Sequence, residues 1–156
     1  MALCTLTAGG CDASGLADDE LVGKVIRVAD GDTITIQTPI GDQEKIRLFG
    51  IDAPERGQAF GRKSQRALAD LVAGRTVTVL IQDEDPYGRL VGVVYADDET
   101  DVNAKMVDLG LAWVYRRYTN DPELIELEED ARDAGRGLWR DPDPLPPHVW
   151  RARNPR

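Results

Sequence analysis

Five charged residues stand at turns and strand ends instead of on helix faces, where charged side chains usually do no more than contact water. Three are carboxylates and two are arginines: Asp32, Arg47, Asp52, Glu55 and Arg89. Carboxylates are the hard oxygen ligands that Ca²⁺ prefers, and guanidinium groups match phosphate oxygens with paired hydrogen bonds. As a set, these residues fit phosphodiester hydrolysis, although each one alone fits a surface salt bridge equally well.

The carboxylates divide into two roles. Asp32 and Asp52 could hold one Ca²⁺ together with the backbone carbonyl of Ala53, and the bound ion would polarise a phosphate oxygen. Glu55 is then the carboxylate left to take a proton from water. The only histidine, His148, lies in a proline-rich tail, so catalysis through histidine is not expected.

The elements that must position these residues follow from hydrophobic periodicity and turn signals. We expect strands over residues 22–29, 33–36, 44–49, 76–81 and 89–95, and helices over 59–72, from the cap Asn103 to 109, and from the cap Asp121 to 135. Three strands, a helix, two strands and further helices predict an α+β fold. Its core would be a five-stranded Greek-key barrel of the OB type with about three helices packed against it.

The chain should form one domain flanked by two irregular segments. With 156 residues, 42% of them hydrophobic, it is long enough for one compact core. We expect a flexible segment over 1–20, the domain over 21–140 and a proline-rich tail over 141–156 that is extended instead of helical. Two tryptophans, Trp139 and Trp150, could pin that tail to the body.

The net charge of -9 argues against a generic basic nucleic-acid coat protein, but not against a local basic site. The acidic excess is concentrated over residues 97–108 and 121–133. An acidic loop and a solvated helix face explain it most simply, and adaptation to high salt is an alternative.

The N-terminal segment bears on location. Small residues precede Cys11, as they do at the cleavage site of a lipoprotein signal, so we expect an extracellular or envelope-tethered protein with a lipid anchor at Cys11. The alternatives are a flexible tail on a cytoplasmic protein and a small disulfide loop between Cys4 and Cys11. A monomer is the default expectation.

Several stretches in this order resemble the signature of the staphylococcal (thermonuclease-type) nuclease family: 30–33, 47–55, 87–89, 102–112 and 137–139. The resemblance covers about residues 22–140. It implies an OB-fold and a Ca²⁺-dependent endonuclease that cleaves DNA and RNA to leave 3′-phosphate and 5′-hydroxyl ends. Degenerate domains of this kind can instead be silent OB modules that bind nucleic acid or protein. We expect an enzyme, because all five charged positions are present.

The resemblance also assigns residues one by one. Asp32 and Asp52 match the calcium ligands, and Arg47, Glu55 and Arg89 match the catalytic trio, with Glu55 as general base. Tyr87 matches a nucleotide-pocket tyrosine and Tyr118 a base-stacking one. This chain departs from the familiar pattern at Ala53, where a threonine is usual, and at Pro86, where a basic residue is usual.

Overall fold

A computed structural model describes residues 20–155 of the chain. The expected leader, the anchor at Cys11 and the Cys4–Cys11 pairing all lie outside these residues and stay predictions. The strands are β1 (Glu20–Val28), β2 (Thr33–Gln37), β3 (Gln43–Leu48), β4 (Ile51–Asp52), β5 (Thr76–Glu84), β6 (Leu90–Tyr95) and β7 (Trp113–Val114). The helices are α1 (Gly61–Val72), α2 (Val102–Asp108), α3 (Pro122–Asp133), the 3₁₀ turn η1 (Gly137–Arg140) and α4 (Pro147–Arg153).

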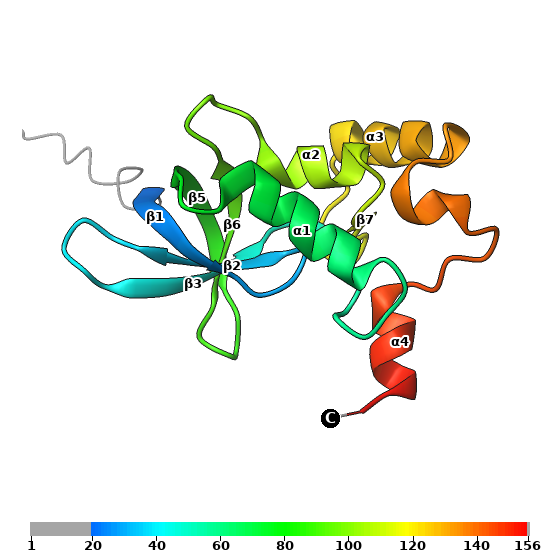
Figure 1. Cartoon of the computed structure of the whole chain (residues 1–156), viewed down its shortest axis with the longest axis horizontal. Coiled ribbons are helices and arrows are strands. Elements are labelled where there is room, and N and C mark those ends of the chain that lie inside the picture. The colour runs from blue at the N-terminus through cyan, green and yellow to red at the C-terminus, as the bar shows by residue number, and fades with distance from the viewer. Residues whose placement is uncertain (1–19, 156) are drawn as a thin grey trace, which may run out of the picture.

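Five strands close a barrel in the order β1-β2-β3-β6-β5. Every neighbouring pair is antiparallel except β3 and β6, which run parallel, so the chain crosses over between them through α1 and β5. The expected five-stranded barrel and the α+β class are confirmed. Figure 1 shows the barrel at one end of the molecule, α3 and α4 at the other, and α1 reaching between them.

Alternation along the strands explains the barrel. Ile34 and Ile36 on β2, and Ile46 and Leu48 on β3, are buried, while the residues between them are more exposed. Helices α1 and α2 close the core with buried apolar residues of their own: Leu68, Val72, Met106 and Val107. Among residues 20–155, no helix is both long and apolar enough to cross a membrane.

The expected cap of α2 was wrong by two residues. Asp101 is the N-cap and accepts a hydrogen bond from the Ala104 amide. Asn103 is instead buried, and its carboxamide accepts from the Val94 amide and donates to the carbonyls of Phe49 and Gly92. It therefore joins α2 to the point where β3 and β6 meet.

A second small sheet was not expected. Ile51 and Asp52 form β4, which pairs antiparallel with β7. Residues 50–57 lie between the expected strand 44–49 and the expected helix 59–72, and two residues are too few for a strand pattern. Pairing with β7 fixes the backbone of Asp52 at the edge of the helical part of the molecule.

The tail was expected to be extended over residues 141–156, and this was wrong for residues 147–153. Residues 147–153 form α4, which begins with Pro147 in its first turn. Proline is tolerated there because the first amide of a helix has no partner within the helix. Trp139 does pin the chain, as expected: its ring meets Trp113 edge-on at 4.4 Å and carries the Arg132 guanidinium over its face.

Candidate active site

Arg47 is the centre of the candidate site. Its Nη1 donates to the backbone carbonyls of Leu48 and Ile51, each at 2.9 Å. Its Nη2 lies 3.2 Å from Asp32 Oδ2 and 3.3 Å from Asp52 Oδ1. One guanidinium therefore joins β3, the turn before β2 and the short strand β4, and it brings the two expected metal ligands to one point.

Asp32 is held in place by the backbone around it. Its carboxylate accepts from the Thr33 hydroxyl at 3.0 Å and from the Ala53 amide at 2.7 Å. The preceding residue has to be glycine, because a Cβ on Gly31 would overlap Ser64 Oγ on α1 and come within 2.8 Å of Ala53 Cβ. This close approach places the turn against both α1 and β4.

The carboxyl groups near Arg47 are costly to keep charged. Asp52 is only 2% exposed, and burial raises its pKa. Burial also raises the pKa of Asp30 to about 7, with the neighbouring Asp32 carboxylate adding to the shift. Buried carboxyls of this kind require cations beside them. Arg47 supplies one of these cations.

Glu55 follows three residues after Asp52, in the segment that leads to α1. Its backbone amide donates to Gln58 Oε1 at 3.0 Å, and the Gln58 amide donates back to the Glu55 carbonyl at 2.8 Å. This turn fixes the backbone at Glu55 and leaves its side chain 20% exposed at the edge of the Arg47 cluster.

Arg151, on α4, is the residue that the sequence analysis missed. Its two terminal nitrogens each donate to one carboxylate oxygen of Asp52, both at 3.0 Å, and its Nη1 also donates to Glu55 Oε1 at 2.9 Å. Hydrogen bonds with Asp52, and then with Glu55, raise the pKa of Arg151. No local signal could have found it, because it lies 99 residues from Asp52 in the chain.

Arg89 pairs with a carboxylate outside this cluster. Its Nε donates to Asp85 Oδ2 at 2.6 Å, and its guanidinium lies 5.7 Å from the centre of the Tyr87 ring. Arg47 pairs with Val91 in the β3–β6 ladder, so Arg89 stands two residues before the partner of Arg47 on the adjacent strand. Residues two apart on a strand share a face, and Arg89 can therefore reach the same side as Arg47.

The two candidate substrate tyrosines are both exposed, Tyr87 at 84% and Tyr118 at 59%. Tyr118 meets the ring of Tyr115 edge-on at 4.8 Å. An exposed aromatic ring held by a neighbour can stack on a nucleic-acid base. Their positions fit that role.

The chain matches the family model described as Staphylococcal nuclease homologue over residues 45–141. The chain belongs to the staphylococcal nuclease family. It is 50% identical over 137 residues to an "Uncharacterized endonuclease" of Escherichia coli O157:H7, covering 86% of this chain and 87% of that protein. It is 43% identical over 140 residues to a "Micrococcal nuclease" of Shigella flexneri, and the match covers 83% of this chain and 79% of that protein. A "Probable staphylococcal-like nuclease CAN1" of Oryza sativa subsp. japonica is 41% identical over 107 residues, and the match covers 69% of this chain and 32% of that protein.

Membership of the staphylococcal nuclease family and the names of these relatives support a nuclease. The matched region contains Arg47, Asp52, Glu55 and Arg89, and it ends before α4. Arg151 therefore comes from a part of the chain that the family model does not cover.

The carboxylate oxygens of Asp32 and Asp52 are the type of ligand that a hard cation prefers. Both carboxylates lie within ion-pair distance of the same nitrogen of Arg47, so their oxygens converge on a position that already accepts positive charge. Ala53, whose carbonyl was the third expected ligand, is buried beside them. Within residues 20–155, no three His, Cys, Asp or Glu side chains gather as a metal site. A cation here would thus be held by two carboxylates, backbone oxygen and water, a set that suits Ca²⁺.

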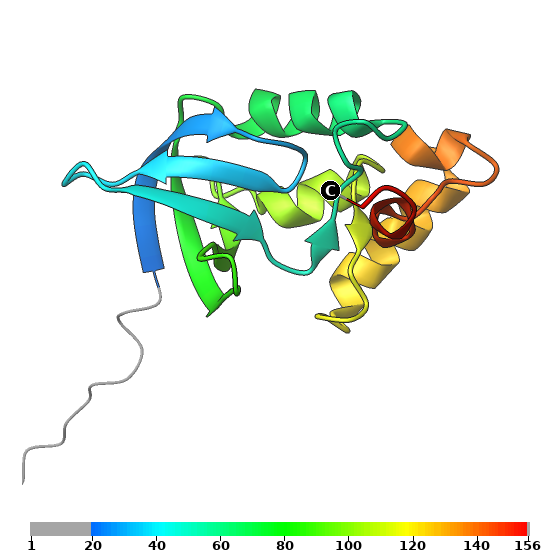
Figure 2. The same cartoon turned by 90° about the horizontal axis from the view of Figure 1, so that it is seen from below.

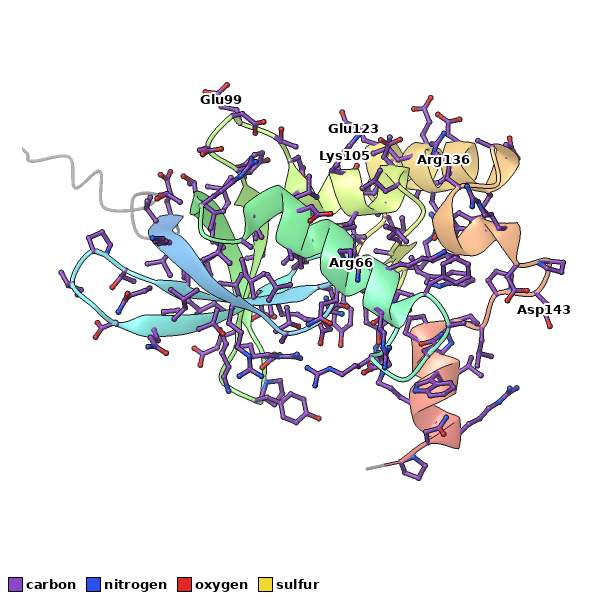
Figure 3. The ribbon with its side chains drawn as sticks, viewed as in Figure 1. Arg66, Glu99, Lys105, Glu123, Arg136 and Asp143 are labelled. Atoms are coloured by element: carbon purple, nitrogen blue, oxygen red, sulfur yellow. The ribbon has the colours of Figure 1, made fainter. Side chains whose placement is uncertain are left out.

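A basic groove borders the site on the side of α1. Three of the residues that line it are arginines, Arg56, Arg62 and Arg66, and no acid lines it. Arg56 Nη2 donates to the Ala29 carbonyl at 3.0 Å, which ties the groove to the turn that carries Asp32. Arg66 lies on the front of α1 in Figure 3. The family resemblance did not point to this groove, and its arginines had been left unassigned.

Proposed function

We propose that this nuclease is a Ca²⁺-dependent endonuclease that hydrolyses DNA and RNA to 3′-phosphate and 5′-hydroxyl ends. The observation that carries the proposal is the convergence of Asp32 and Asp52 on Arg47, with Glu55 joined to Asp52 through their shared partner Arg151. The two buried carboxylates can accept a cation, and the third carboxylate, at their edge, can act as a base for water. The fixed guanidinium on the same surface can bind phosphate with paired hydrogen bonds.

Arg47 has a double role in this proposal. Its Nη1 is committed to two carbonyls, so the plane of the guanidinium is fixed before substrate arrives. A phosphate oxygen bound at Nη2 replaces contacts with Asp32 or Asp52, at a donor whose plane is already set. Donors oriented in advance stabilise the charge that develops on phosphate in the transition state. Arg89 supplies the second guanidinium once its pairing with Asp85 is exchanged for phosphate.

Glu55 is the proposed general base. One of its oxygens accepts the proton from a water molecule whose oxygen forms the new bond to phosphorus, and the bond from phosphorus to the 5′-oxygen breaks. The leaving 5′-oxygen takes up a proton from solvent water, which gives the 5′-hydroxyl, and Glu55 returns its proton to solvent. The phosphate stays on the 3′ side. A Ca²⁺ held by Asp32, Asp52 and the Ala53 carbonyl would offset negative charge on the phosphate.

The test is degradation of single-stranded DNA and RNA with added Ca²⁺, with Mg²⁺ instead and with chelator, each at low and high salt. We expect cleavage with Ca²⁺ alone, and 3′ ends that a polymerase extends only after phosphatase treatment. Glu55→Gln and Arg89→Ala should remove most of the activity. Binding without cleavage under every condition would make the protein a silent OB module.

A further inference from the structure

Helix α4 lies over the candidate active site although it is the last element of the chain. Figure 2 shows α4 end-on beside the segment between β4 and α1. Its position is set by Arg151, whose fork takes both oxygens of Asp52 and one oxygen of Glu55. The side chain of Arg151 is 41% exposed, whereas that of Asp52 is almost fully buried. The arginine therefore enters the site from the solvent side.

These contacts use the atoms that the proposed reaction needs. Asp52 Oδ1 already accepts from Arg47, and Arg151 adds a donor to each oxygen of that carboxylate. A divalent cation on Asp52 would stand next to the Arg151 guanidinium, and two positive charges at contact distance repel each other. Glu55 Oε1 also accepts from Arg151, so this oxygen is engaged while the helix is docked.

Little besides Arg151 attaches α4 to the domain. Within the described residues, the backbone hydrogen bonds of residues 142–155 stay inside that segment. Further attachments are a hydrogen bond from the Gln58 side chain to the Leu145 carbonyl, the burial of Pro147, the partial burial of Val149, and the nearness of the half-buried Trp150 to Gly57. The helix can therefore leave without breaking a strand or helix of the barrel.

We propose that α4 is a self-blocking strap, with Arg151 as a resident cation that Ca²⁺ must displace from Asp52 and Glu55. This inference rests on the proposed function, because it concerns the same metal and base positions. In the docked state Arg151 neutralises the buried carboxylates, and in the released state these groups serve the cation and the attacking water. The apparent affinity for Ca²⁺ is then reduced by the fraction of molecules in which the helix is docked.

The experiment compares the wild type with Arg151→Gln and with the matched control Arg153→Gln, which removes the same charge two residues later on an exposed position. Calcium affinity is measured by isothermal titration calorimetry. If docking is favoured about ten to one, Arg151→Gln should bind Ca²⁺ about tenfold more tightly, and Arg153→Gln should stay within about twofold of the wild type. Arg151→Lys should lie between, because lysine cannot make the forked contact.

Two further readouts separate the strap from other roles. Addition of Ca²⁺ to the wild type should change Trp150 fluorescence and expose the tail to protease, and a Trp150→Phe variant identifies the signal. At subsaturating Ca²⁺, Arg151→Gln should cleave DNA faster than the wild type, and at saturation the two rates should be equal.

The outcomes are distinct from those for the proposed function. Equal calcium affinity in all variants, with cleavage intact, would overturn the strap alone. A lower turnover of Arg151→Gln with unchanged calcium affinity would also overturn it, since Arg151 would then be a substrate contact. No calcium binding in any of the proteins would overturn both the metal assignment and the strap.

Discussion

Arg47 Nη2 lies 3.2 Å from Asp32 Oδ2, although Arg47 lies on β3 and Asp32 in the turn before β2. The register of β2 and β3 explains the distance, because Thr33 pairs with Arg47 and Asp32 directly precedes Thr33. The same guanidinium also holds the carbonyls of Leu48 and Ile51. Arg47 is thus both a proposed phosphate ligand and a structural clamp.

Replacement of Arg47 should therefore affect stability as well as activity. Arg47→Ala leaves two buried carboxylates without this cation, and breaking such a pair from one side costs roughly 3–5 kcal/mol. We expect the free energy of unfolding, measured by urea denaturation, to fall by an amount of that order and turnover to be lost. Arg89→Ala is the matched control, because Arg89 pairs with Asp85 outside the cluster, and unfolding should change much less. Equal stability of both variants would contradict the clamp.

Glu55→Gln should reduce turnover without weakening the fold. The amide keeps the shape of the side chain but cannot accept the proton of water, and loss of a general base costs typically 10²–10⁴-fold. Single-turnover cleavage of a labelled oligonucleotide measures the effect, with thermal unfolding as the check on the fold. Activity close to that of the wild type would remove Glu55 from the mechanism.

Asp32→Asn should weaken calcium binding, because the amide removes one of the two charges that face the proposed cation. The Ala53 amide donates to Oδ2 and the Thr33 hydroxyl binds Oδ1. An asparagine oxygen at the Oδ2 position still accepts from the Ala53 amide, and its NH₂ group can donate to the Thr33 hydroxyl, so the fold should persist. Calorimetric titration measures the affinity, and Asp42→Asn in the exposed β2–β3 turn is the control. An unchanged titration in Asp32→Asn would contradict the assignment.

The groove beside α1 should matter for long substrates only. We expect Arg62 and Arg66, which line this groove, to bind phosphates of a longer strand. Arg62→Gln and Arg66→Gln should therefore each raise the Kd for a single-stranded oligonucleotide and make its salt dependence shallower by about one counterion. Cleavage of a dinucleotide should not change. Arg140→Gln on η1 removes an exposed charge elsewhere and should leave both values as in the wild type. A loss of dinucleotide cleavage in the groove variants would contradict this role.

Asp101 gives a prediction for pH. Burial raises its pKa above the ordinary value of 3.8, although the amides of Ala104 and Asn103 partly offset the shift. Because the folded value is the higher one, the fold binds the proton more tightly, and stability from this group declines as pH rises from about 4 through the folded value.

Asp101→Asn keeps an oxygen to cap α2 but has no charge to bury. The variant should therefore gain stability relative to the wild type as pH rises from 4 to 7, in urea denaturation at each pH. Asp101→Ala, which has neither the cap nor the charge, should be about 1 kcal/mol less stable than Asp101→Asn at both pH values. A parallel pH dependence of Asp101→Asn and the wild type would show that the carboxyl does not carry the effect.

The sequence predicted what is encoded locally. Alternation of apolar residues around Ile34 and Ile46 located two barrel strands, because burial of every second side chain leaves a direct trace in the chain. The order of the motifs around Asp32, Arg47 and Arg89 indicated the family before any contact was known. The short strand β4, the true cap Asp101 and the helix α4 were missed, because their signals are two residues long or run against the preference of a proline-rich segment.

The sequence by itself determined the barrel, the family and the residue types of the candidate site. The tertiary structure decided how those residues are paired. The Arg47 guanidinium binds both Asp32 and Asp52, and Arg89 pairs with Asp85. Arg151, from the C-terminal helix, pairs with Asp52 and Glu55. The physical reason is that a charged side chain carries no periodicity that names its partner. Its partner is selected by burial and by the path of the backbone, and both exist only in the folded chain.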